Sequence, residues 1–194
     1  SIKDSQLYKD SLARYPKQES ESPGYGEFFS ADGTQFAYIP QGTRGQFVVL
    51  NGIKQKEYEG IGDFVINHAH TDFAYVGIRE ERDERSDGAA VVVAHGVEGK
   101  VYNYIREETL VFSNNDQQLA YAAVISKEPT YQSFMVLNGQ ELTHYDGVEQ
   151  PVFSLNDTVF AYIARKDTLR GASEYFFCSC PSITAKFACA FTTS

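Results

Sequence analysis

Two histidines and three cysteines are the side chains with the clearest potential for metal or redox chemistry. His68 and His70 stand two residues apart, so on a strand both would lie on one face, where one metal ion could bind both. Their stretch has the composition of a turn, which favours an ordinary turn substitution. Cys178 and Cys180 would also share a strand face, but a structural zinc site needs more ligands than these and Cys189 supply. We therefore predict no metal site and interpret the cysteines as thiols in an apolar terminal segment.

Basic side chains in four polar stretches are the candidate binding residues. The stretches are Pro40–Gln46, Arg79–Gly88, Ser126–Gln132 and Arg165–Ser173. They contain eight of the 17 lysines and arginines of the chain: Arg44, Arg79, Arg82, Arg85, Lys127, Arg165, Lys166 and Arg170. At least seven acidic residues accompany them, so the surface that they form is mixed in charge. The run Arg79–Asp87 alternates in sign, which is typical of a solvated insertion and also fits a charged contact loop for a partner protein.

Composition and motifs argue against several classes of function. The chain has 194 residues, a net charge of −9 and an apolar fraction of 42%, which is too high for a disordered chain. An acidic chain lacks the basic footprint that nucleic-acid phosphates require, and no apolar run approaches the roughly 18–20 residues of a membrane span. No Gly-x-Ser-x-Gly, His-Glu-x-x-His or phosphate-binding glycine motif occurs. We therefore favour a non-enzymatic protein without a cofactor.

A repeat organises most of the chain and must position these loops. Four ten-residue segments align without gaps and end in Ala-Tyr, with steps of 37, 46 and 41 residues: residues 29–38, 66–75, 112–121 and 153–162. A second, apolar motif follows in each unit, and we align residues 47–52, 91–96, 134–139 and 175–180. A third motif begins at Tyr58, Tyr102 and Tyr145 and is missing from the fourth unit.

These motifs predict short strands joined by tight turns. Aromatic and β-branched runs bounded by Gly, Asn and Asp indicate strands, and Asn-Gly after an apolar run is a strong hairpin signal. Four antiparallel strands in about 40 residues have the dimensions of a propeller blade. We therefore predict an all-β propeller of about four four-stranded blades. It comprises an N-terminal segment, residues 1–27, and a four-repeat domain, residues 28–194, with units of about 28–63, 64–109, 110–151 and 152–194.

The unit Phe-Ser-x-Asp-Gly-x-x-Phe-Ala-Tyr at residues 29–38 resembles the WD40-like repeat of TolB-type β-propellers, and the resemblance covers about residues 28–180. The chain departs from that pattern where the family has proline, at Ala31, His68, Asn114 and Leu155. The resemblance implies a propeller that serves as a binding platform, an enzyme cap or a scaffold. It also implies export to the periplasm or cell surface.

The ends of the array leave alternatives open. Residues 1–27 are either a linker or a strand that completes the fourth blade, and only a weak helical pattern occurs, between Leu7 and Leu12. The ring closes within the chain, or the chain is part of a larger ring or homo-oligomer joined through open blade edges.

In such a propeller the loops between second and third strands share one face, where binding residues usually lie. We expect a protein or peptide partner there. The alternatives are a carbohydrate-active or other hydrolytic propeller, and a structural assembly subunit.

Overall fold

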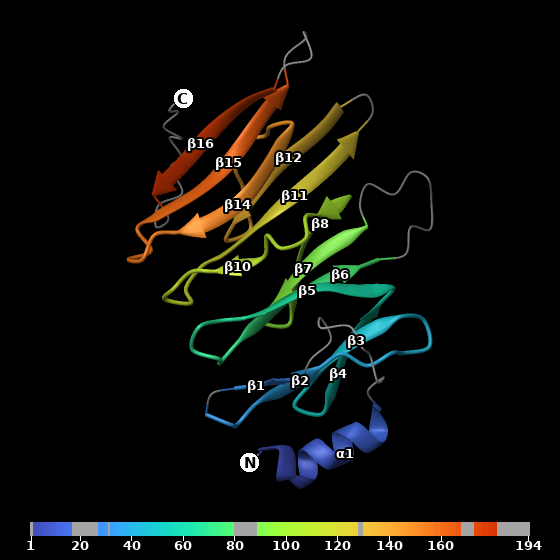
Figure 1. The fold of residues 1–194 in the computed structure, drawn as a ribbon. Helices are drawn as coiled ribbons and strands as arrows, with labels where there is room; N and C mark the ends of the chain where they lie inside the picture. The colour runs from blue at the N-terminus through green and yellow to red at the C-terminus, as the bar shows by residue number, and fades with distance from the viewer. Residues whose placement is uncertain are drawn as a thin grey trace.

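The computed structural model describes residues 2–16, 27–30, 32–79, 89–127, 130–167 and 173–181. Within them, four antiparallel sheets follow one another along the chain and stack in a row (Figure 1). This all-β, propeller-like architecture confirms the predicted fold class. No helix in these ranges is both long enough and apolar enough to span a membrane.

Each repeat unit forms one sheet, in chain order. The first sheet consists of β1 (Phe28–Phe29), β2 (Phe36–Tyr38), β3 (Gln46–Leu50) and β4 (Ile53–Tyr58). The second consists of β5 (Gly60–Ile66), β6 (Phe73–Ile78), β7 (Ala90–Ala94) and β8 (Val97–Tyr102). The third has β9 (Tyr104–Ile105), β10 (Val111–Phe112), β11 (Leu119–Lys127), β12 (Thr130–Leu137) and β13 (Gln140–Glu141). The fourth has three strands in the described residues: β14 (Gly147–Phe153), β15 (Val159–Asp167) and β16 (Ser173–Pro181).

The hairpins after β3, β7 and β12 have the predicted turn chemistry. The pairs Asn51-Gly52, His95-Gly96 and Asn138-Gly139 all have positive φ, as a two-residue type I′ turn requires. The asparagine side chains add a second function, because Oδ1 of Asn51 accepts the Phe36 N–H at 2.8 Å and Oδ1 of Asn138 accepts the Leu119 N–H at 3.0 Å. One residue type therefore both turns the chain and anchors the neighbouring strand.

Successive sheets pack through apolar clusters that the Ala-Tyr motif supplies. Neighbouring residues of a strand point to opposite faces, so each motif serves two interfaces. Ala74 lies in the cluster between the second and third sheets, whereas Tyr75 lies in the cluster between the first and second. In the next sheet, Ala120 lies in the cluster between the third and fourth sheets, and Tyr121 lies in the cluster between the second and third. The recurring tyrosines are thus core residues.

Two aspartates at left-handed turn positions connect neighbouring sheets. Asp116 of the third sheet accepts the backbone N–H groups of His68, at 2.7 Å, and Ala69, at 2.8 Å, from the second. Asp157 of the fourth sheet accepts the equivalent N–H groups of residues 114 and 115 at 2.9 and 2.7 Å. Both aspartates have positive φ, 61° and 53°. Each carboxylate caps the turn of the preceding sheet.

The N-terminal segment is helical rather than a linker or a blade-completing strand in its described part. A short 3₁₀ turn (Ile2–Asp4) leads into α1 (Gln6–Arg14), whose N-cap Ser5 accepts the Tyr8 N–H at 3.2 Å. Tyr8 packs edge-on against Phe36, and the Ser11 hydroxyl hydrogen-bonds the Tyr38 hydroxyl at 2.7 Å. The weak apolar pattern between Leu7 and Leu12 therefore marks a helix that caps the first sheet.

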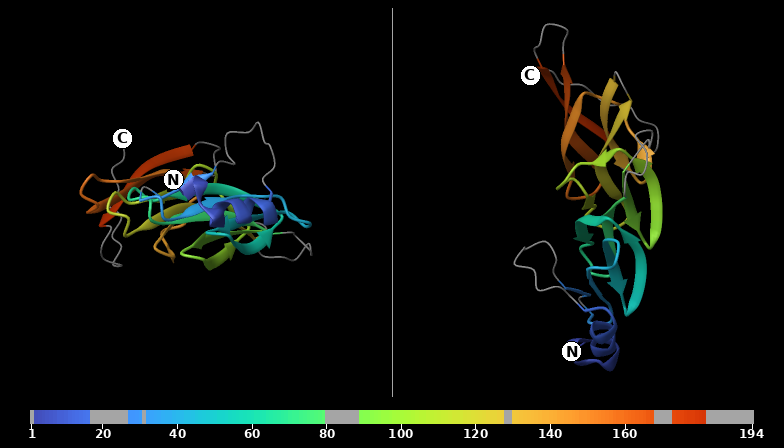
Figure 2. Two further views of the ribbon diagram at one scale, coloured as in Figure 1. Left: turned by 90° about the horizontal axis from the view of Figure 1, so that it is seen from below. Right: turned by 90° about the vertical axis from the view of Figure 1, so that its right-hand side faces the viewer.

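The row of sheets is open in the described part of the chain. Figure 2 shows α1 and the first sheet at one end and the fourth sheet at the opposite end. The fourth sheet packs on the third through Phe160, Tyr162 and Cys178, whereas no sheet formed by the described residues packs against its other face. Of the alternatives for ring closure, these residues do not themselves close a ring.

The register of β16 corrects our alignment of the fourth unit by one residue. Ala161 pairs with Ser179, whereas the equivalent Ala120 pairs with Leu137. Residues 176–181 are therefore the counterparts of 134–139, not 175–180. Both alternating sets of this strand contain aromatic or thiol side chains, so its apolar pattern does not specify which set faces the core.

Candidate functional site

A groove of about 970 Å³ opens on the side of the loops that join second and third strands. We call it the loop-face groove, and its lining residues are Thr43, Arg44, Lys56, Glu57, Tyr58, Glu59 and Arg79. It combines the β2–β3 loop and β4 of the first sheet with the residue that follows β6 in the second. Two of the predicted binding residues, Arg44 and Arg79, therefore lie together.

Close backbone packing positions the loop that carries Arg44. Gly45 has φ 155°, and a Cβ there would lie 1.9 Å from the carbonyl oxygen of Tyr58, so only glycine lets the loop approach β4 this closely. The carboxylate of Glu57 accepts the Arg44 backbone N–H at 2.7 Å and the Lys54 ammonium at 2.8 Å. The backbone of Arg44 is thus anchored while its guanidinium faces the groove.

One carboxylate joins the two sheets at the groove. Glu98 on β8 accepts the Tyr58 hydroxyl at 2.5 Å and the Lys56 ammonium at 2.7 Å through Oε1. Its Oε2 accepts Nη2 of Arg79 at 2.9 Å. A single acidic side chain of the second sheet therefore holds three donors, two of them from the first sheet.

Burial and hydrogen bonding shift the ionisation of this network. Burial, followed by the hydrogen bond to Glu98, raises the pKa of the Tyr58 hydroxyl well above its usual range. Burial on its own would raise the pKa of Glu98. The hydrogen bonds from Lys56 and Tyr58 and the charge of Arg79 outweigh this effect and lower the pKa to about 2. The carboxylate therefore stays ionised at any physiological pH.

Stability should consequently depend on Glu98 in acid. Its pKa is about 2 in the folded chain against an ordinary 4.5, so its contribution is complete above about pH 4.5 and is lost as the pH falls towards 2. We expect the stability difference between the wild type and Glu98→Gln, measured by urea unfolding, to shrink steadily over that window. A difference that is constant from about pH 6 to pH 2.5 would show that the carboxylate is not held by these partners.

Of the other predicted binding residues, Arg165 and Lys166 are described, and they line clefts other than this groove. Arg165 lines a separate cleft of about 290 Å³ with Arg106 and Glu149, and its Nη1 pairs with Asp167 at 2.9 Å. Lys166 lines a third cleft, of about 420 Å³, with residues of the third sheet. Lys127 ends β11, and its side chain lies outside the described part, as do Arg82, Arg85 and Arg170. The predicted loop face therefore divides into several local sites.

The histidine and cysteine candidates lie in turn and core positions. His68 and His70 occupy the turn after β5, and His70 has φ 54°. Cys178 and Cys180 lie in the core between the third and fourth sheets, where the Cys178 thiol donates to the Tyr145 hydroxyl at 3.5 Å. Cys189 falls outside the described residues. No group of three potential metal ligands occurs within the described ranges.

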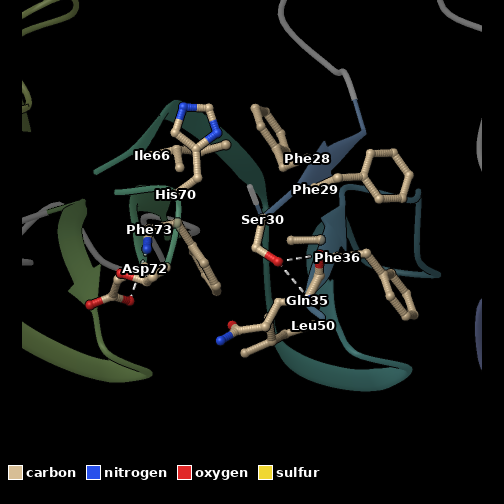
Figure 3. Close-up of a pocket in the computed structure, with 12 residues that line it drawn as sticks. Phe28, Phe29, Ser30, Gln35, Phe36, Leu50, Ile66, His70, Asp72 and Phe73 are labelled. Carbon is tan, nitrogen blue, oxygen red and sulfur yellow. Dashed lines mark hydrogen bonds between the residues drawn. The ribbon is translucent and has the colours of Figure 1, made fainter. Parts of the chain in front are cut away.

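A small apolar pocket lies on the opposite, turn side, between the first two sheets. Figure 3 shows Phe28 and Leu50 of the first sheet opposite Ile66 and Phe73 of the second. Its volume is about 20 Å³, room for about one water molecule. Phe28 stacks on Phe64 with ring centroids 3.9 Å apart, so this interface is closely packed. We interpret the pocket as a packing defect rather than a binding site.

Sequence reasoning missed Lys56, Tyr58 and Glu98, although a repeated signal marked them. Tyr58 and Tyr102 recur at one position, and Glu141 recurs at the position of Glu98 in the next unit. Lys100 donates to Glu141 at 2.6 Å, just as Lys56 donates to Glu98. A lysine of one unit that donates to an acid of the next therefore forms a recurring link between sheets, and at the first of these links the Tyr58 hydroxyl donates as well.

The fold defines the class of protein, an all-β protein of stacked antiparallel sheets with a propeller-like arrangement. No family model matches the sequence, and no curated protein is significantly similar to it. Among solved structures, hydrazine synthase of Kuenenia stuttgartiensis is similar at 10% identity and a TM-score of 0.45, over 86% of this chain and 53% of that one. TolB of Acinetobacter baumannii is similar at 12% identity and a TM-score of 0.39, over 84% of this chain and 42% of that one. The chain thus spans about half the length of the structures that it resembles.

Proposed function

We propose that the chain is a binding module built from WD40-like repeats of the TolB type, and that its loop-face groove binds an acidic segment of a partner protein. The observation that carries the proposal is the convergence of Arg44, Lys56 and Arg79 on one groove. The cations come from a loop, a strand and a strand end, so folding gathers them from distant parts of the sequence.

Unused donors favour a carboxylate-bearing partner. Nε of Arg79 is buried and has no acceptor in the described part of the chain, although Nη2 is bound to Glu98. The Arg44 guanidinium has no ion pair among the described residues, since Glu57 bonds only its backbone N–H. Nε of Arg79 is itself inaccessible, so the exposed guanidinium of Arg44 is the donor that a partner carboxylate would reach, through a charge-assisted hydrogen bond.

The groove suits an extended segment with an aromatic or apolar residue between its acids. The Tyr58 ring lines the floor and is almost completely buried. Glu57 and Glu59 at the rim would repel a uniformly acidic chain at those points, which favours spaced rather than contiguous acids.

Charge reversal in the groove tests this proposal. We expect Arg44→Glu to weaken the binding of a fluorescein-labelled peptide with alternating Glu and Phe by about tenfold at low salt, without a change in melting temperature. The matched control is Lys166→Glu, which reverses one charge in a different cleft and should change affinity less than about twofold. Fluorescence anisotropy gives both values.

Two results would contradict the proposal. One is an equal effect of Arg44→Glu and Lys166→Glu, which would show that net charge alone sets the affinity. The other is equally tight binding of a peptide with lysine in place of glutamate, which would show that the groove does not select carboxylates.

A further inference from the structure

The outer face of the fourth sheet repeats a surface that is covered in every other sheet. The register places Phe177 at the position that Val48, Val92 and Met135 occupy in the first three sheets. Those three side chains are buried, and each belongs to the cluster formed with the following sheet. Phe177 is instead 53% exposed, and the neighbouring Tyr175 is 59% exposed.

The turn of the fourth sheet also differs from its counterparts, because within the described residues no carboxylate accepts its N–H groups. The second and third sheets each present two turn N–H groups that a carboxylate of the following sheet accepts, from Asp116 and Asp157 respectively. The counterparts in the fourth sheet are the N–H groups of Leu155 and Asn156. Among the described residues, no side chain accepts either of them, and Leu155 is almost fully exposed.

The opposite end of the row is closed by a different element. Phe36, Tyr38 and Val49 lie on the face of the first sheet that points away from the second, and α1 covers this face, with Tyr8 packed against Phe36 and Tyr38. Terminal units of repeat proteins need such capping because their outer faces are otherwise apolar. Within the described residues, the row is therefore capped at the first sheet and uncapped at the fourth.

We propose that the outer face of the fourth sheet, formed by Val152, Ile163, Tyr175 and Phe177, binds a further β-sheet of the same repeat type supplied by a partner polypeptide. The partner sheet carries an aspartate at the left-handed position of its first turn, where it accepts the N–H groups of Leu155 and Asn156. The interaction continues the interface that joins the sheets within this chain. It is separate from the loop-face groove.

A second copy of this chain fits the surface less well. Its first sheet is covered by α1, and Gly33 stands at the turn position where Asp116 and Asp157 supply their carboxylates. Its Asp32 is already engaged by Ser30 and Thr34 of its own turn. The partner sheet therefore is not the first sheet of a second copy. It has an aspartate in its first turn, as the fourth unit has at Asp157.

A fusion that offers such a sheet tests the proposal with the full chain intact. A second copy of residues 147–181 is appended after Ser194. The 13 residues 182–194 then connect the two copies. The connection is long enough, because the corresponding segment before the fourth sheet, residues 140–146, has only seven residues. We expect hydrogen exchange at the Leu155 and Asn156 amides to slow by about tenfold or more in the fusion, measured by NMR.

Two variants of the fusion separate the two parts of the interface. Asp157→Asn in the appended copy should restore faster exchange at both amides while the appended sheet stays docked. Phe177→Asp in the original copy should prevent docking, and in the chain without the fusion it should leave the melting temperature within about 2 °C because the side chain is exposed.

Three outcomes would overturn the proposal. Unchanged exchange in the fusion would show that the face does not accept a sheet. Slow exchange of both amides in the chain alone would show that another segment of the chain already covers them. A dimer of the chain alone that Phe177→Asp dissociates would assign the face to a second copy. Light scattering distinguishes that dimer from a monomer of 21.7 kDa.

Discussion

Replacing Phe134 by alanine is expected to lower the free energy of unfolding by about 3–5 kcal/mol. Phe134 on β12 is completely buried in the core between the second and third sheets. Its ring packs edge-on against Tyr102, with centroids 5.6 Å apart, and stacks on His144 at 4.1 Å. Rigid strands on both sides cannot collapse into the space that the ring leaves, so the cost includes a cavity. Urea unfolding followed by circular dichroism measures it.

The matched control is Phe177→Ala, which removes the same ring from the uncovered face of the fourth sheet. More than half of that side chain is exposed, so we expect a loss below about 1 kcal/mol. Equal losses for the two variants would show that the outer face is buried in solution and would contradict the open row of sheets.

Gly77→Ala should be the second most damaging change, with a loss of about 1–3 kcal/mol from overpacking. A Cβ at Gly77 on β6 would lie 2.5 Å from Cε1 of Tyr58, closer than carbon atoms approach in folded proteins. Tyr58 cannot swing aside, because its ring is buried and its hydroxyl is bound to Glu98. The change should therefore also disturb the loop-face groove and weaken peptide binding, as thermal unfolding and anisotropy together would show.

Gly99→Ala on β8 is the control for this change. A Cβ there would meet its nearest neighbour, the carbonyl oxygen of Val92, at 3.4 Å, an ordinary contact. We expect a stability change within about 0.5 kcal/mol and unaltered peptide affinity. If Gly99→Ala were as damaging as Gly77→Ala, the effect would come from replacing a strand glycine in general and not from the Tyr58 ring.

Local chemistry explains why most of the fold could be predicted from the sequence. The pairs Asn51-Gly52 and Asn138-Gly139 specify their turns through their own backbone preferences, and Ala-Tyr at each second strand specifies two core faces. The β16 register could not be predicted because Phe176 and Phe177 point to opposite faces, and either suits a core. The role of α1 depends on its contact with the first sheet, which no local pattern encodes.

The groove could be predicted only in part for the same reason. Arg44 and Arg79 belong to stretches whose polarity marks them as loops. Lys56 and Glu98 lie on strands of different sheets, 42 positions apart in the chain, and only the stacking of those sheets brings them to 2.7 Å. A contact of this kind depends on the angle between sheets, which the alternation of polar and apolar residues leaves open.

The helical cap at one end has a consequence for the order in which the molecule comes apart. In a linear array each unit is stabilised mainly by its immediate neighbours. The first sheet lies between α1 and the second sheet, whereas in the described part of the chain the fourth has a neighbour on one side only. Opening should therefore begin at the fourth sheet and move towards α1, so that amides of β15 exchange earlier than those of β6. We therefore expect a partner that binds the fourth sheet to slow the unfolding of the whole array.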